Sequence, residues 1–107
     1  MVEFLVELEF SLPQGLTPSR ESELLTAERE RGEALGRAGH LRAIWRIPGR
    51  RANCGIWSVR DVTQLHELLA SLPLFPYADI VVRPLARHVL AGSCPGLPAG
   101  LVVPQVE

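Results

Sequence analysis

The chain lacks the features that mark a membrane, secreted or nucleic-acid-binding protein. Its 107 residues contain no run of eighteen apolar residues and no basic-then-apolar N-terminus, so we expect neither a spanning helix nor a signal peptide. Twelve acidic and eleven basic residues nearly cancel, which gives no electrostatic reason to expect nucleic acid or an anionic membrane as partner. We therefore expect a single cytoplasmic domain with one modest core.

Cysteine is scarce, and the common catalytic motifs are absent. Cys54 and Cys94 have no metal-type spacing, so a reduced protein is favoured over a disulfide between them. The three histidines are too dispersed to predict a metal site. The sequence contains no phosphate loop, no Gly-x-Ser-x-Gly elbow and no Rossmann fingerprint.

Residues 2–10 alternate with a period of two, which predicts a strand with one apolar face toward helices. The apolar face carries Val2, Phe4, Val6, Leu8 and Phe10. The opposite face carries three carboxylates, which must meet water, a cavity or basic partners: Glu3, Glu7 and Glu9.

A helix is predicted from Thr17, as N-cap before a proline, to about Ala38, with Gly39 as the stop. Glu28 and Arg31 fall inside its apolar stripe. Two interpretations stay open. In the first, these two residues, which are three positions apart, pair with each other at the edge of the stripe. Alternatively, Glu28 points into a cavity between helix and sheet, where desolvation would raise its pKa toward that of a useful base.

The remaining pattern predicts two strands joined by a turn, over residues 41–47 and 53–59, then a helix capped by Asp61 and a last strand over 77–82. Strand, helix, strand, strand, helix, strand is the ferredoxin-like α+β plan, a four-stranded antiparallel sheet with both helices on one face. Pairing of two open sheet faces would enclose a polar cavity between subunits.

Two prolines, Pro73 and Pro76, form a rigid corner between the second helix and the last strand. Leu74 and Phe75 on this corner are expected to plug the core or to contact another subunit. We assign residues 1–90 to the domain and residues 91–107 to a Gly/Pro-rich tail, for which mobility is favoured over an added edge strand at 101–103.

Carboxylates, arginines and an amide are what the chain offers for catalysis. They suit proton transfer next to a carbonyl, in which a carboxylate takes the proton and Arg or Asn steadies the enolate oxygen. Composition and spacing lead no further than that.

Several stretches resemble the muconolactone Δ-isomerase family. They are Leu72-Pro-Leu-Phe-Pro-Tyr-x-Asp-Ile80, Pro84-Leu-x-Arg-His88, Trp45-Arg-Ile-x-Gly49, Ala52-Asn53, Leu12-Pro13, Pro18, Glu28-Arg29-Glu30 and Leu65-His66. The resemblance runs ungapped over about residues 1–88. It implies ferredoxin-like subunits that pair into dimeric α+β barrels and assemble into rings of ten. It also implies a cofactor-free proton shift in muconolactone, which gives the 3-oxoadipate enol-lactone in the catechol branch of aromatic catabolism.

The first interpretation is therefore an isomerase of the muconolactone type that acts on a lactone or another enolisable carbonyl compound. In it we expect Glu28 to be the base and Arg51 and Asn53 to hold the carboxylate or enolate oxygen. Expected substrate-binding residues are Glu7, Trp45, Cys54, Trp57 and Tyr77. The chain departs from the family at Glu7, Arg51 and the pair Cys54-Gly55. Glu7 and Arg51 are interpreted as an exchanged charge pair between neighbouring strands.

Two alternatives remain at this stage. One is a barrel enzyme recruited to a natural-product pathway as a cyclase, dehydratase or cofactor-free oxygenase. The other is a non-catalytic small-molecule binding module, which would be favoured if Glu28 met bulk solvent or were locked to Arg31.

Overall fold

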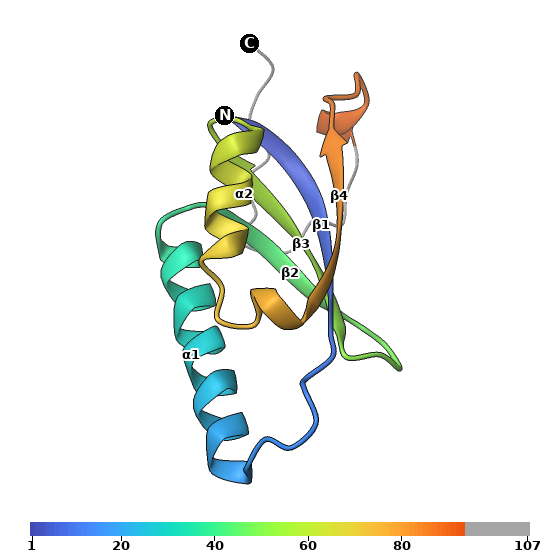
Figure 1. The fold of residues 1–107 in the computed structure, drawn as a ribbon. Helices are drawn as coiled ribbons and strands as arrows, with labels where there is room; N and C mark the ends of the chain where they lie inside the picture. Colours follow the sequence, from blue (N-terminus) through green and yellow to red (C-terminus); the bar gives the residue numbers. More distant parts are fainter. Residues whose placement is uncertain (94–107) are drawn as a thin grey trace.

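The chain folds into one antiparallel sheet covered on one face by two helices (Figure 1). The computed structural model describes residues 1–93. The strands are β1 (Val2–Phe10), β2 (Leu41–Ile47), β3 (Ala52–Val59) and β4 (Ala78–Leu85), in the spatial order β2-β3-β1-β4. The helices are α1 (Pro18–Arg37) and α2 (Val62–Ala70), with short 3₁₀ turns η1 (Phe75–Tyr77) and η2 (Ala91–Ser93). The ferredoxin-like fold predicted from the sequence is confirmed.

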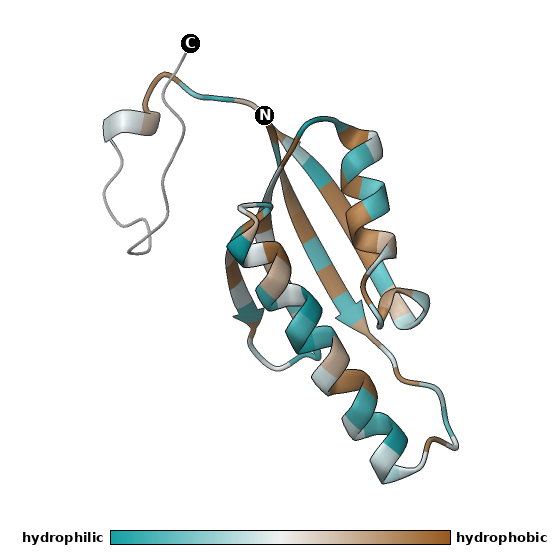
Figure 2. Ribbon diagram, turned by 90° about the vertical axis from the view of Figure 1, so that its left-hand side faces the viewer, coloured by the Kyte–Doolittle hydropathy of each residue, from teal (hydrophilic) through white to brown (hydrophobic). Residues whose placement is uncertain are grey.

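The alternation of β1 separates the two faces of the sheet, as Figure 2 shows by the changing hydropathy along this strand. Phe4, Val6 and Leu8 are buried beneath the helices, with Val6 fully inaccessible. Their cross-strand partners on β3 include Trp57 and Asn53, so these side chains share the helix-covered face. The carboxylates of β1 lie on the opposite face, which no described helix covers (Figure 1).

Both helices begin as the sequence predicts. Thr17 Oγ1 accepts a hydrogen bond from the Arg20 N–H at 3.2 Å, and Asp61 Oδ1 accepts one from the Gln64 N–H at 2.8 Å. Helix α1 ends before Gly39, whose φ of +84° reverses the chain toward β2. Leu24 and Leu35 of α1 are buried, which places the predicted stripe of this helix against the sheet.

The two-proline corner closes the core rather than presenting its leucine to another subunit. Leu74 is 2% exposed and is buried within the chain, so the expectation that this side chain contacts a neighbouring subunit is wrong. Phe75 is half-buried against the core, and the ring of His66 meets it edge-on with centroids 6.2 Å apart. Tyr77 belongs to the 3₁₀ turn, and β4 runs from Ala78 through Pro84 because an edge strand tolerates proline.

A β-bulge explains the imperfect alternation of β2. Leu41 lies opposite Trp57 and Ala43 opposite Ile56, so one extra residue, Arg42, is inserted on this strand. Gly55 lies beneath the bulge, where a Cβ would come within 2.9 Å of the Ala43 carbonyl oxygen. A side chain at this position would therefore force the bulge to shift, which accounts physically for the glycine in the Cys54-Gly55 pair.

The described residues contain no helix that is long and apolar enough to cross a membrane. Cys54 has a free thiol. Cys94, the possible edge strand at 101–103 and all of the predicted tail after residue 93 lie outside the described residues.

Candidate active site

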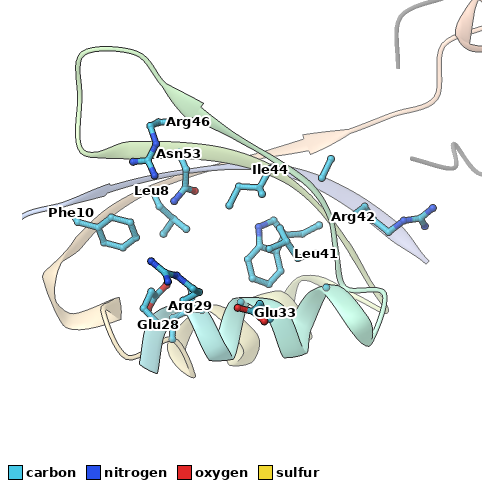
Figure 3. Close-up of a pocket in the computed structure, with 15 residues that line it drawn as sticks. Leu8, Phe10, Glu28, Arg29, Glu33, Leu41, Arg42, Ile44, Arg46 and Asn53 are labelled. Carbon is cyan, nitrogen blue, oxygen red and sulfur yellow. The ribbon is translucent and has the colours of Figure 1, made fainter. Parts of the chain in front are cut away.

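A cavity of about 540 Å³ lies between α1 and the helix-covered side of the sheet (Figure 3). Its volume falls in the range of about 300–1,000 Å³ that is usual for small-molecule sites. Apolar side chains form much of its wall: Leu8, Phe10, Leu41, Ile44, Trp57 and Leu72. Polar groups enter from two sides, with Glu28 and Arg29 on α1 and Arg46 and Asn53 on the strands opposite (Figure 3).

Glu28 is the half-buried carboxylate of this cavity. Its Oε1 accepts a hydrogen bond from the Leu74 N–H at 2.9 Å, which fixes the side chain between helix and corner. Burial raises the pKa of Glu28, and the Leu74 hydrogen bond offsets part of that rise. A carboxylate that is both positioned and more basic than usual is suited to remove a proton from carbon.

The alternative in which Glu28 pairs with Arg31 is wrong. Arg31 Nε instead donates a hydrogen bond to Ser71 Oγ at 3.0 Å, and no ion pair within residues 1–93 joins Arg31 to Glu28. Glu28 therefore neither meets bulk solvent fully nor is locked to its helical neighbour. Both conditions that would have favoured a non-catalytic module are absent in the described part of the chain.

Asn53 brings an uncommitted amide to the cavity wall. Its Oδ1 is buried and has no hydrogen-bond partner among the described residues. Such groups are rare in folded proteins, where buried polar atoms are nearly always paired. The amide of Asn53 is thus available to a ligand in the cavity, and Trp57, which is 2% exposed, lines the same cavity.

Arg46 is one of four charged cavity residues that sequence reasoning missed as site residues, and the others are Arg29, Glu33 and Arg42. Arg46 lies directly across the β2–β3 pair from Asn53, and both side chains reach the cavity from the sheet (Figure 3). No ion pair of the described residues involves Arg46. The signal was present, because Arg46 belongs to the quoted Trp45-Arg-Ile motif, but its side of the hairpin depends on the cross-strand register.

A second, smaller hollow of about 200 Å³ adjoins the first near the hairpin turn. It is lined by Trp45 and Arg51, and it shares Asn53 and Arg46 with the larger cavity. Arg51 itself belongs to the turn and is exposed. The structure therefore places Arg51 and Trp45 beside the Glu28 cavity but not among its lining residues.

Three further residues predicted for the site lie apart from both hollows. Glu7 and Cys54 are paired across β1 and β3 on the open face of the sheet, and Tyr77 lies in the corner turn. The interpretation of Glu7 and Arg51 as a charge pair is wrong, because the neighbouring residue Arg50 turns toward the carboxylates of β1. Arg50 Nε donates to Glu9 Oε1 at 3.0 Å, and its Nη1 lies 4.0 Å from Glu7 Oε2.

The available groups restrict the chemistry. The sequence contains no lysine, so Schiff-base formation with a lysine amine is excluded and every side-chain cation at the cavity is a permanently charged arginine. Within residues 1–93 no group of three or more His, Cys, Asp or Glu side chains could hold a metal ion. A carboxylate facing an amide and a guanidinium is an arrangement for acid–base chemistry.

Comparison with known proteins identifies similar sequences and a similar fold. The sequence model of the family described as muconolactone delta-isomerase matches residues 2–90. Muconolactone Delta-isomerase 2 of Acinetobacter lwoffii is 40% identical over 79% of this chain and 88% of its own length, and the Rhodococcus opacus muconolactone Delta-isomerase is 38% identical over 82% and 95%. A crystal structure of muconolactone isomerase superposes with a TM-score of 0.76 at 40% identity, covering 81% of this chain and 91% of that one.

Proposed function

The chain belongs to the muconolactone Δ-isomerase family, and from that premise we propose that it moves a proton within muconolactone or a closely related lactone acid in the cavity beside Glu28. The chain is an isomerase in fold and sequence. The single observation that supports this assignment to the cavity is the half-buried Glu28 carboxylate, held by the Leu74 N–H and left unpaired with Arg31.

The reaction is a proton shift between two carbons of an unsaturated lactone. Glu28 would remove the proton from the ring carbon that is conjugated through the double bond to the carbonyl, leaving an enolate. The same carboxyl group would then return the proton to the carbon next to the carbonyl. Atoms and electrons balance without any oxidant or cofactor, and burial makes Glu28 a stronger base than a solvated glutamate.

The opposite wall supplies what the enolate and the acid side chain of such a substrate need. We assign the side-chain N–H of Asn53, which lines the cavity, to the developing negative charge on the lactone oxygen, since N–H donors aimed at such a charge lower the barrier. We assign Arg46 to the substrate carboxylate, because guanidinium groups bind carboxylates with two parallel hydrogen bonds. We thus propose Arg46, which lies opposite Asn53, for the carboxylate-binding role that the sequence analysis predicted for Arg51.

The test is direct. Purified protein is supplied with muconolactone, and formation of the enol-lactone is followed by ultraviolet absorbance, with heat-denatured protein as the blank. We expect turnover without added metal or organic cofactor. Untouched muconolactone would contradict the proposal and would favour recruitment of the fold to other chemistry, such as a cyclase or dehydratase step.

Arg46 and Arg51 provide a matched pair for testing carboxylate recognition. Hydrogen bonds to charged groups contribute about 1.5–3 kcal/mol, so Arg46→Gln should raise KM roughly 10- to 100-fold. Arg51→Gln removes the same charge from the exposed turn. Because solvent screens that charge, this substitution should change KM less than about threefold. Steady-state kinetics of both variants decides the assignment, and a larger effect at Arg51 would return the role to that residue.

We further propose that the open face of the sheet mediates self-association into dimers, and that these form the ring of ten implied by the family resemblance. Large apolar side chains remain accessible there, with Trp45 41%, Val81 46% and Leu85 44% exposed. Exposed apolar groups gathered on one face are typical of an interface. Sedimentation equilibrium giving the mass of one chain would contradict this.

A cytoplasmic location, consistent with the free Cys54 thiol, remains part of the same proposal.

A further inference from the structure

Arg31 lies one turn along α1 from Glu28, at the spacing where helical side chains meet. A guanidinium and a carboxylate at this spacing would ordinarily form an ion pair. Here they diverge: Glu28 bonds to the backbone of Leu74 at the corner, whereas Arg31 bonds to Ser71 at the end of α2. The two side chains are therefore held apart by hydrogen bonds to different partners, Leu74 and Ser71.

Ser71 has the geometry to do this. Its hydroxyl donates to the Leu68 carbonyl at 2.6 Å, which commits the proton and leaves the oxygen lone pairs directed elsewhere. Those lone pairs accept the Arg31 Nε–H at 3.0 Å. The Ser71 N–H also closes the last turn of α2, so the residue is held in place by its own backbone.

We propose that Ser71 is a positioning residue whose hydroxyl holds the Arg31 guanidinium at the end of α2 and so keeps this cation from pairing with the Glu28 carboxylate. This inference rests on the proposed function, because it matters only if Glu28 is the base. Its consequence is chemical: a base paired with arginine would be weaker and less free to approach a carbon-bound proton. Ser71 itself is not among the residues that line the cavity.

Other groups around Glu28 do not replace this control. Burial is the main cause of its raised pKa, followed by the opposing hydrogen bond from Leu74. The corner offers Glu28 a backbone amide rather than a charge, and the hydroxyl at the end of α2 bonds to Arg31 instead. The charged and polar side chains that share the cavity, from α1, β2 and β3, are Arg29, Glu33, Arg42, Arg46 and Asn53.

The experiment measures the pH dependence of kcat/KM on muconolactone for the full chain. Loss of the acceptor in Ser71→Ala frees Arg31 to pair with Glu28, so the pKa of the acidic limb should fall by about one unit. The near-isosteric Ser71→Cys, whose sulfur accepts hydrogen bonds weakly, should shift it in the same direction and covers the case in which the alanine variant fails to fold. Ser71→Thr keeps the hydroxyl and should leave the pKa of the acidic limb at its wild-type value.

The double variant Ser71→Ala/Arg31→Gln separates positioning from a structural role. If Ser71 acts through Arg31, removing the cation should return the limb to its wild-type position. A limb that does not move in Ser71→Ala or Ser71→Cys, while Glu28→Gln is inactive, would overturn this proposal alone. Full activity in Glu28→Gln would instead overturn the assignment of the base, and with it the proposed mechanism.

Discussion

Replacing Glu28 with glutamine should lower kcat on muconolactone by about 10²- to 10⁴-fold, the usual contribution of a positioned general base. Glutamine keeps an oxygen that can accept the Leu74 N–H, so the helix and the corner stay in place, but it cannot take up a proton. Steady-state rates by ultraviolet absorbance, with circular dichroism to verify the fold, give the result. A variant that retains more than about a tenth of the wild-type kcat would contradict general-base catalysis by Glu28.

The thermal stability of Glu28→Gln provides the control for this variant. The direction of the expected change in Tm follows from the burial of Glu28. The pKa of Glu28 is raised in the folded state, so its favourable contribution to folding is present at low pH and is lost as pH rises through that raised value. At neutral pH the wild-type chain therefore bears the cost of a half-buried charge. Glu28→Gln should unfold at a Tm equal to or above that of the wild type at pH 7, and this advantage should vanish in acid.

The second large effect is expected at Asn53. Removing one donor to a developing oxyanion typically costs about 10²- to 10³-fold in kcat, and Asn53→Ala should fall in that range. Asn53 Oδ1 forms no hydrogen bond with another described residue, so the substitution breaks no hydrogen bond to that oxygen. A loss of kcat with little change in Tm is the expected combination, whereas unchanged turnover would remove Asn53 from the site.

Cys54 is the matched control for Asn53, because it follows on the same strand and its side chain lies on the opposite face. Cys54→Ala should keep kcat within about twofold of the wild type, since the half-buried Cys54 side chain does not line the cavity. A large loss at Cys54 would support the substrate-binding role that the sequence analysis predicted for this residue. It would also imply that the open face contributes to catalysis.

The fold could be predicted because its signals are local. The alternation of β1, the caps Thr17 and Asp61 and the glycine after α1 each specify an element within a few residues. The bulge at Arg42 could not be predicted, because it depends on how β2 pairs with β3, where the Ala43 carbonyl comes close to Gly55. The burial of Leu74 depended likewise on how the corner docks against the core.

The site was predictable only in part, for the same physical reason. Spacing along α1 left Glu28 free to pair with Arg31 or to enter a cavity, and the choice is made by Ser71 and Leu74, more than forty positions away. The hairpin register then determines that Arg46 lies across from Asn53 at the cavity, whereas Arg51 lies in the turn. Likewise, Arg50 contacts Glu9 where the sequence suggested that Arg51 would contact Glu7.

The proline in β4 has a consequence for solubility. This strand forms one edge of the sheet, and an exposed edge can recruit strands from other molecules into fibrils. Pro84 has no N–H to offer an incoming strand, and the exposed charges of Asp79 and Arg83 would also oppose such stacking. A concentrated solution of this protein is thus protected at that edge against uncontrolled strand addition.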